Sequence, residues 1–203
     1  MEKNLLLIYG SGGHATSTYN LAKDLNLEVE YFIDPFTSLD SKFGIKILDH
    51  YEFTSDQKCV VIAIGDNKLR EQIYISLLKY SNLVFPKLIH PTAYVSKLSK
   101  ISEGTVVMQG ASIGPNCDIG SFCIINSAAS VDHDCRIENF SSLSPSVTLA
   151  GSVHIGLGST IYMNSAIADG VSIGKNSVIG ACSFVKDDVG NGEISYGTPS
   201  RSR

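Results

Sequence analysis

The chain has 203 residues, of which 43% are hydrophobic, and a formal net charge of −4 at pH 7. This length suits one or two small globular domains. The acidic balance argues against nucleic acid as the main partner, because binding to phosphates requires a basic stripe. No apolar run approaches the roughly 18 to 20 residues that cross a bilayer, so no membrane span is expected. The short apolar start breaks into glycines and lacks the longer apolar region of a signal peptide, which predicts a cytoplasmic protein.

The first 84 residues alternate predicted strands with predicted helices. Strands are expected at residues 5–9, 29–33, 59–64 and 83–85, and helices from the glycine-rich turn to about 25 and at about 67–79. The second helix has Leu69, Ile73 and Leu77 at four-residue spacing, and Asp66 is placed to cap it. This alternation predicts a small parallel, Rossmann-like α/β domain over residues 1–84, whose ligands bind at the carboxyl ends of the strands.

A glycine-rich turn follows the first predicted strand. The run Gly10-x-Gly12-x-x-Ala15 matches the dinucleotide-binding fingerprint, and Asp34 lies about the expected distance further on. Such a turn places a phosphate-bearing group near a helix N-terminus, while the acidic residue holds a ribose or a base. Two alternatives stay open, a tight turn without a ligand and an NAD site, although the domain has room for only half of a full dinucleotide fold.

The remainder of the chain, residues 85–203, repeats with a period of six. Every sixth residue from Ile89 to Val185 is Ile, Val or Leu, and the residue two positions earlier is usually small. Residues two apart point to the same side of a strand, so each unit buries one large and one small side chain. Three faces of six residues then stack as coils of eighteen residues in a triangular prism of parallel strands. The pattern leaves the handedness of the prism open.

Two further features fit this prism. Glycine often follows the large residue, at positions 114, 120, 156, 174 and 180, which suits tight corners. Cys117, Cys123 and Cys135 fall in the small column and are interpreted as packing residues. The five cysteines of the chain form no CxxC pair, and nothing indicates disulfides.

His133 is the residue of the repeat best suited to chemistry. It lies in Asp132-His133-Asp134, so an adjacent carboxylate could orient its ring or raise its basicity. An imidazole with a pKa near neutrality suits the base in acyl transfer from a thioester, although an exposed histidine without a role remains an alternative. Gly151 lies eighteen residues later, one full coil away, where its backbone N–H could hold a developing oxyanion. Asn126 lies about one face earlier.

A zinc site is the competing interpretation, since a hexapeptide-repeat carbonic anhydrase needs a histidine triad. His154 lies twenty-one residues after His133 and is out of register with it, and His90 belongs to an early coil. We therefore expect no metal.

Five motifs together resemble one known family. They are Ile8-Tyr9-Gly10-Ser11-Gly12-Gly13-His14, Ala63-Ile64-Gly65-x-Asn67-x-x-Arg70, Val131-Asp132-His133-Asp134-Cys135, Leu149-Ala150-Gly151 and Gly197-Thr198-Pro199-Ser200-Arg201. Over essentially its whole length the chain resembles the bacterial sialic-acid O-acetyltransferase-like sugar acyltransferases. It is most similar to the branch that acetylates UDP-linked 4-amino-4,6-dideoxy sugars, as in bacillosamine synthesis. The resemblance implies a nucleotide-binding α/β domain, a left-handed β-helix, and a homotrimer with active sites between subunits.

The resemblance also implies roles for individual residues. His133 would be the general base, and Asp134 would raise its basicity. Asn126 would position the histidine or the acceptor, and the Gly151 N–H would contact the thioester carbonyl. The residues implied for the acetyl-CoA groove are Ser142, Gly151, Met163, Gly180 and Ala181, and those implied for the nucleotide sugar are Gly12, Gly13, His14, Asp34, Gly65 and Lys68. Pro35 stands where the bacillosamine branch has a second Asp, so the nucleotide base stays open.

Three functions follow from these observations. The first is an acetyl-CoA-dependent N-acetyltransferase, in which the C4 amine of a nucleotide-linked 4-amino-4,6-dideoxy sugar attacks acetyl-CoA directly with His133 as base. The second is an O-acetyltransferase of sialic acid or another sugar hydroxyl, which needs stronger help from the base. The third is a non-catalytic scaffold that binds sugar nucleotides. The first is our hypothesis, with acetyl-CoA as co-substrate and no metal.

Overall fold

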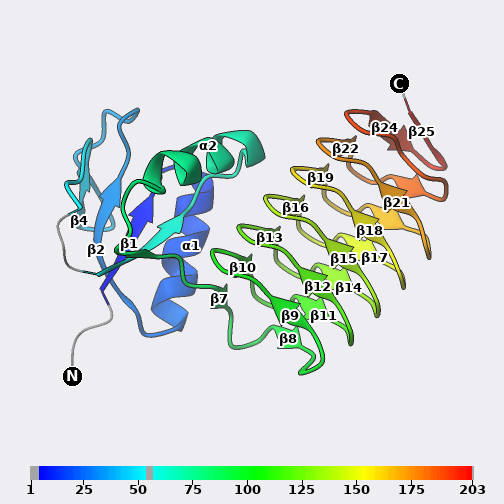
Figure 1. Cartoon of the computed structure of the whole chain (residues 1–203), viewed down its shortest axis with the longest axis horizontal. Helices are drawn as coiled ribbons and strands as arrows, with labels where there is room; N and C mark the ends of the chain where they lie inside the picture. Colours follow the sequence, from blue (N-terminus) through cyan, green and yellow to red (C-terminus); the bar gives the residue numbers. More distant parts are fainter. Residues whose placement is uncertain (1–4, 54–56, 203) are drawn as a thin grey trace. The chain divides into compact units, whose positions relative to one another are not determined.

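The computed structural model describes residues 5–53 and 57–202, and the chain separates into two compact units, Met1–Leu88 and Ile89–Arg203 (Figure 1). Within the described ranges, neither helix is long and apolar enough to cross a membrane. The first unit follows the alternation of strands and helices, and the second follows the six-residue repeat.

The first unit is a six-stranded sheet with helices α1 (Gly13–Asp24) and α2 (Asn67–Leu77). The strand order is β3-β4-β2-β1-β5-β6. The strands are β1 (Leu5–Tyr9), β2 (Glu28–Ile33), β3 (Ser41–Lys42), β4 (Ile45–Leu48), β5 (Lys58–Ile62) and β6 (Leu83–Val84). Neighbours pair in parallel, except for β3 and β4, which are antiparallel. The parallel sheet and both helices confirm the α/β prediction.

Local chemistry explains these elements. β1 is apolar along its length and buried in its middle, as expected of a central parallel strand. α2 begins after Asp66, whose side chain accepts a hydrogen bond from the Leu69 N–H at 2.8 Å, as predicted for a cap. The sequence does not predict the β3–β4 hairpin, because its strands are short and its turn holds Phe43 at a φ of 54°, where bulky residues are rare.

The second unit is a parallel β-helix made of three sheets (Figure 1). Each strand pairs with the strand one coil away, so that Ile119, Ile137 and Ile155 stack directly. The large column and the apolar members of the small column form one hydrophobic core cluster, and most of the Ser and Thr members of the small column are buried beside it. This is the left-handed β-helix of hexapeptide repeats that the resemblance implies.

The short strands of the β-helix fall into three sheets. One sheet contains β7 (Leu88–Ile89), β10 (Val106–Val107), β13 (Ile124–Ile125), β16 (Ser142–Leu143), β19 (Thr160–Ile161), β22 (Val178–Ile179), β24 (Ile194–Gly197) and β25 (Ser200–Ser202). A second contains β8 (Tyr94–Val95), β11 (Ser112–Ile113), β14 (Ser130–Val131), β17 (Thr148–Leu149), β20 (Ala166–Ile167) and β23 (Phe184–Val185). The third contains β9 (Lys100–Ile101), β12 (Asp118–Ile119), β15 (Arg136–Ile137), β18 (His154–Ile155) and β21 (Ser172–Ile173).

The corners of the prism are made by backbone in the left-handed region. A positive φ recurs at every sixth residue from Gly104 to Cys182, and most of these residues are not glycine. The prediction that the glycines after the large column turn the corners is therefore wrong. Those glycines allow the backbones of adjacent coils to approach closely, because a Cβ on Gly156 would lie 2.7 Å from the carbonyl carbon of Gly174 in the next coil.

Replacing Ile119 by Ala tests the inward column. Its side chain is fully buried (0% exposed) between Ile101 and Ile137 of the neighbouring coils. We expect the free energy of unfolding, measured in urea at fixed protein concentration, to fall by about 2–5 kcal/mol because a cavity remains. The matched control is Asp118→Ala, whose side chain leaves the same strand toward solvent and which should change stability by less than about 0.5 kcal/mol. Equal losses in the two variants would contradict the inward assignment.

Candidate active site

His133 lies at a corner of the β-helix, two residues after the end of β14. Its Nδ1 lies 2.7 Å from Oδ2 of Asp134, and 51% of its side chain is exposed. Asp134 has a φ of 58°, and this turn lets two adjacent side chains face each other. Asn116, one coil earlier, donates a hydrogen bond from Nδ2 to the other Asp134 oxygen at 2.5 Å. The structure thus brings His133 and Asp134 together, and Asn116 of the neighbouring coil holds the Asp134 carboxylate in place.

Gly151 lies one coil from His133 and directly against its ring. A Cβ on Gly151 would lie 2.5 Å from Cε1 and 2.7 Å from Nε2 of His133, and 2.9 Å from Oδ1 of Asp169. Only a hydrogen fits there, so the ring requires glycine. The Ser152 N–H donates to the His133 carbonyl at 2.8 Å and ties the two coils together. Within the part of the chain that the structure describes, the Gly151 N–H donates to no acceptor.

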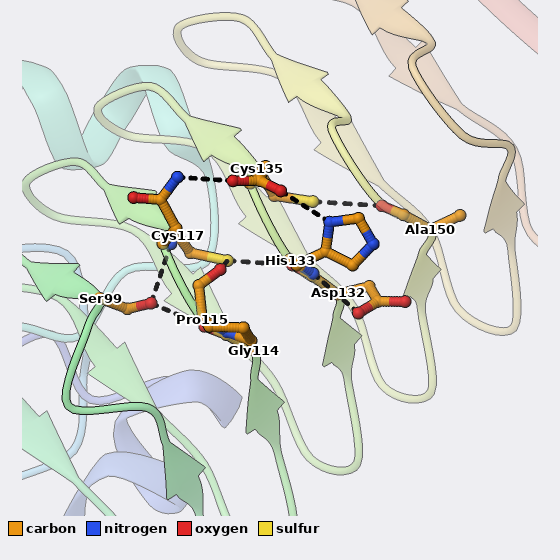
Figure 2. Close-up of polar contacts among 10 residues, drawn as sticks. Ser99, Gly114, Pro115, Cys117, Asp132, His133, Cys135 and Ala150 are labelled. Carbon is orange, nitrogen blue, oxygen red and sulfur yellow. Dashed lines mark hydrogen bonds and ion pairs between the residues drawn. The ribbon is translucent and has the colours of Figure 1, made fainter.

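Three carboxylates act on the His133 ring. The hydrogen bond that His133 donates to Asp134 and the negative charges of Asp132 and Asp169 raise the pKa of His133 above its ordinary value. Hydrogen bonds from Asn116 and His133 lower the pKa of Asp134, so this carboxylate stays ionised. An ionised Asp134 holds a proton on Nδ1, which leaves the Nε2 lone pair free to accept one. The backbone N–H of His133 is held separately, by Oδ1 of Asp132 at 2.8 Å (Figure 2).

Three residues expected in the acetyl-CoA groove lie at a different corner of the prism. Met163 and Ala181 are exposed one coil apart, and the Cys182 N–H donates to the Met163 carbonyl at 2.9 Å. Gly180 packs against Tyr196, since a Cβ on this glycine would lie 2.7 Å from the Tyr196 Cβ. These residues follow β19 and β22, whereas the His133 corner follows the next sheet.

Asn126 and Ser142 also lie away from His133. Asn126 follows β13, in the same corner column as Gly180, and its Oδ1 accepts the Ser127 N–H at 2.8 Å. Ser142 is buried in β16. Among residues 5–53 and 57–202, the Asn126 side chain makes no hydrogen bond to His133, so within one chain this amide does not position the histidine.

The glycine-rich turn of the first unit lies at the carboxyl end of β1. Gly10 has a φ of 108°, and a Cβ there would lie 2.9 Å from the Ala63 carbonyl oxygen, so only glycine allows this approach. Gly12 is the N-cap of α1 and Gly13 is its first residue, and nothing lies within 4 Å of a Cβ at either position. The first N–H groups of α1 are therefore open to an anion.

Asp34 and Lys42 hold this turn from two sides. Oδ2 of Asp34 accepts the Ser11 N–H at 2.8 Å and the Ser11 hydroxyl at 2.6 Å, and its Oδ1 accepts the Phe36 N–H at 3.0 Å. Lys42 donates from Nζ to the Ser11 carbonyl at 2.5 Å and lies 3.4 Å from the Gly12 carbonyl. Asp34, which is expected to contact a ribose or base, thus also fixes the shape of the glycine-rich turn.

His14, Gly65 and Lys68 complete the expected nucleotide-sugar residues. His14 is half-buried, and its Nε2 is the one buried side-chain polar atom of the described residues without a hydrogen-bond partner. Burial and the nearby Arg70 charge lower the pKa of His14 to about 4, so the ring is neutral at pH 7. Arg70 is itself buried and donates to the Ile64 carbonyl at 2.8 Å. Gly65 and Lys68 are exposed around the start of α2.

Three residues that support the candidate sites were not identified from the sequence. Asn116 lies eighteen residues before Asp134, and Asp169 lies eighteen residues after Gly151. Because one coil is eighteen residues long, the period of the repeat could have predicted both neighbours. Lys42 lies in the unpredicted hairpin, where nothing in the sequence pattern points to it.

No group of His, Cys, Asp and Glu within residues 5–53 and 57–202 is placed to hold a metal ion. His154 instead places its Nε2 3.0 Å from Oε1 of Glu138. The other Glu138 oxygen accepts the Leu157 N–H at 3.2 Å, so this pair ties two coils together.

Asp134→Asn tests the source of basicity in His133. Asn accepts the left-handed corner as readily as Asp, but it removes the group that contributes most to the raised pKa of His133. We expect the pKa of His133, followed by NMR through the Cε1–H, to fall in this variant. The acid limb of any base-dependent rate would then move to lower pH, because the ring loses its proton at lower pH. Asp169→Asn, which removes the smallest contribution, should lower the pKa less, and an equal or larger fall there would contradict the assignment.

Two protein families match the two units of the chain. Residues 5–77 match the PglD N-terminal domain. Residues 152–187 match the bacterial transferase hexapeptide family, described by six repeats.

Solved structures match both units together. PerB from Caulobacter crescentus, in complex with CoA and GDP-perosamine, is 27% identical with a TM-score of 0.88, over 98% of this chain and 96% of that chain. A variant of GDP-perosamine N-acetyltransferase from the same organism, with a histidine replaced by alanine, is 27% identical with a TM-score of 0.87 over the same 98% and 96%. The acetyltransferase domain of PglB from Neisseria gonorrhoeae, in complex with acetyl coenzyme A, is 28% identical with a TM-score of 0.92, over 99% and 100%. These matches confirm the resemblance stated from the sequence: the chain carries a PglD N-terminal domain and bacterial transferase hexapeptide repeats, as its structural neighbours among the sugar N-acetyltransferases do.

Proposed function

We propose that this chain is an acetyl-CoA-dependent N-acetyltransferase whose acceptor is the C4 amine of a nucleotide-linked 4-amino-4,6-dideoxy sugar. The observation that carries the proposal is the contact of the His133 ring with Gly151 across one coil. The Nε2 of His133 is then free to accept a proton, and the Gly151 N–H, which has no acceptor among residues 5–53 and 57–202, lies at the same corner of the prism. Neither of these groups is needed to hold the prism together.

This pair suits direct attack by an amine. The unprotonated nitrogen bonds to the thioester carbonyl carbon, and the C=O electron pair moves onto the oxygen, which the Gly151 N–H stabilises. Nε2 of His133 takes the proton that the nitrogen loses. When the carbonyl re-forms, the C–S bond breaks and CoA leaves as a thiolate, which the imidazolium protonates. No Ser or Cys nucleophile is required, because the amine itself attacks.

The first unit has the features of a site for a nucleoside diphosphate. The open N-terminus of α1 at Gly12 and Gly13 offers N–H groups and the positive end of the helix dipole to phosphates. Asp34, Gly65 and Lys68 would hold the nucleoside and sugar. The C. crescentus relative is in complex with CoA and GDP-perosamine, and the N. gonorrhoeae relative with acetyl coenzyme A. We infer that this chain binds the same two classes of molecule, with the nucleotide base left open.

We also propose a homotrimer with active sites between subunits. His133 and Gly151 lie at one corner of the prism, and Asn126 and Met163 lie at another, so the two corners can meet only across two copies. Ser142, Gly180 and Ala181 would then line the acetyl-CoA groove from the facing copy. Since acetyl-CoA and sugar nucleotides are both made in the cytoplasm, we propose that the enzyme acts there.

A panel of UDP-, dTDP- and GDP-linked 4-amino sugars with acetyl-CoA tests the proposed reaction. We expect release of free CoA thiol with at least one of these amines, measured with a thiol reagent. His133→Ala should slow transfer to that acceptor by about 10²–10⁴-fold, the usual contribution of a general base. His154→Ala is the matched control, because it removes a histidine–carboxylate pair elsewhere on the prism, and it should keep the wild-type rate.

Other acceptors separate the competing functions. Thiol release with sialic acid or another sugar hydroxyl, and with none of the amines, would identify an O-acetyltransferase. Thermal stabilisation by sugar nucleotides with none by acetyl-CoA at any concentration would identify a binding scaffold and end the enzyme proposal.

Lys42→Met tests the nucleotide site of the first unit. Lys42 holds the carbonyls of the glycine-rich turn, so its loss should loosen the phosphate-binding N–H groups. We expect the dissociation constant for UDP or GDP, measured by calorimetry, to rise about tenfold, which corresponds to one charge-assisted hydrogen bond. Lys46→Met, an exposed lysine on the neighbouring strand, should leave the affinity unchanged. Equal affinities of the two variants for UDP or GDP would show that Lys42 does not contribute to the nucleotide site.

A further inference from the structure

The small inward column of the β-helix is also a column of hydrogen-bond donors. A hydroxyl or thiol donates to the carbonyl fifteen residues later, in the next coil. The pairs are Ser99 to Gly114, Thr105 to Gly120, Cys117 to Asp132, Cys123 to Glu138, Cys135 to Ala150, Ser141 to Gly156, Ser159 to Gly174 and Ser165 to Gly180. Figure 2 shows the bonds of Ser99, Cys117 and Cys135. Each accepting carbonyl therefore points into the prism.

A carbonyl that points inward also determines the direction of the N–H of the same peptide. A trans peptide places its C=O and N–H on opposite sides, so the N–H of the following residue points outward. Four corners show this, because the outward N–H donates there to a side chain outside the core. They are His133 to Asp132 Oδ1 at 2.8 Å, Ser121 to Asn139 Oδ1 at 2.8 Å, Lys175 to Asn191 Oδ1 at 2.8 Å and Leu157 to Glu138 Oε2 at 3.2 Å.

The peptide between Ala150 and Gly151 repeats this geometry at the active site. Sγ of Cys135 donates to the Ala150 carbonyl at 3.2 Å (Figure 2), and the N–H of that peptide belongs to Gly151. At the four corners above, a side chain of the protein takes the outward N–H. The Gly151 N–H takes no acceptor among the described residues, so it is available to a ligand at the corner that the His133 ring covers.

We propose that Cys135 is a positioning residue for acetyl transfer, because its thiol holds the Ala150 carbonyl inward and so aims the Gly151 N–H at the thioester oxygen. The inference rests on the proposed function, in which this N–H receives that oxygen. Cys135 touches no reacting atom and acts through one peptide unit. Cys117 holds the peptide of His133 in the same way, since its Sγ donates to the Asp132 carbonyl at 2.9 Å.

The interior position suits a thiol that keeps its proton. Cys135 is 1% exposed, and contact with the Cys117 thiol together with burial raises the pKa of Cys135. The column also accepts a hydroxyl, since Ser141 donates to its carbonyl at 2.9 Å. It accepts a side chain without a donor as well, because Val153 follows Cys135 one coil later and is fully buried. Substitutions that keep or remove the donor are therefore compatible with the fold.

Variants of Cys135 and Cys123 form a matched pair. Cys123 is equally buried and donates to the Glu138 carbonyl at the same 3.2 Å, but on another face. We expect Cys135→Ala to lower kcat by about tenfold or more with little change in KM for acetyl-CoA, because a misdirected oxyanion donor acts on the transition state. Cys135→Ser should restore kcat, whereas Cys123→Ala should lose comparable thermal stability and keep kcat.

Cys135→Val covers the case in which the alanine variant does not fold. It fills the core without a donor and should lower kcat as Cys135→Ala does. Wild-type kcat in Cys135→Ala and Cys135→Val would overturn the proposal. A loss in Cys135→Ser as large as the loss in Cys135→Ala would overturn it too, because the hydrogen bond would then not be what matters.

Glycine-selective ¹⁵N NMR detects a change in the environment of the Gly151 N–H without any acceptor substrate. The Gly151 cross-peak, identified by its absence in Gly151→Ala, should move in Cys135→Ala and stay in place in Cys123→Ala. An unmoved cross-peak in Cys135→Ala would overturn the positioning role, whatever the activity. A moved cross-peak in a protein that transfers acetyl to no acceptor would support control of this N–H by Cys135 and would count against the proposed function alone.

Discussion

Backbone hydrogen bonds between successive coils decide which side chains meet on this β-helix. Each strand pairs with the strand eighteen residues away, and corner groups bond in the same register, as the Ser152 N–H does with the His133 carbonyl. A slip of one residue would turn every inward side chain outward, and the buried column of Ile, Val and Leu makes that slip costly. His133 therefore faces Gly151 because the core allows no other register. The geometry of the candidate active site is a consequence of the packing of the prism.

The same register explains how much of the site could be read from the sequence. A period of six is visible without any structure, and adding one coil to His133 leads to Gly151. The same step links Asp134 to Asn116 and Gly151 to Asp169, so both were within reach of the sequence. Lys42 was not, because its contact with the glycine-rich turn joins residues about thirty apart through a hairpin with little local signal.

The corners show where sequence rules fail for a physical reason. Glycine is the default for positive φ, yet the prism places Asn, Asp, Ser and even Phe at these positions. Phe122 and Phe140 adopt φ values of 55° and 56° and stack with ring centroids 5.3 Å apart. The strain of the left-handed backbone is offset by packing between coils, which a residue-by-residue rule does not include. The strands of the repeat were predictable because their signal is periodic burial.

A second histidine–carboxylate pair on the β-helix shows why His133 suits the role of the proposed base better than His154 does. In the pair of His154 and Glu138, the carboxylate comes from the preceding coil and lies at Nε2, 3.0 Å away. The nitrogen that points away from the backbone is then occupied. In the pair of His133 and Asp134, the carboxylate comes from the next residue and lies at Nδ1, the nitrogen nearer the backbone.

The left-handed φ of Asp134 makes this second arrangement possible. Adjacent side chains on an extended strand point to opposite faces, so neighbours in sequence do not meet there. At the corner the chain turns, Asp134 reaches back to Nδ1, and Asn116 holds its other oxygen from the coil before. Nε2 is left free and faces Gly151. The turn that closes each face of the prism thus also selects which nitrogen of the histidine can accept a proton.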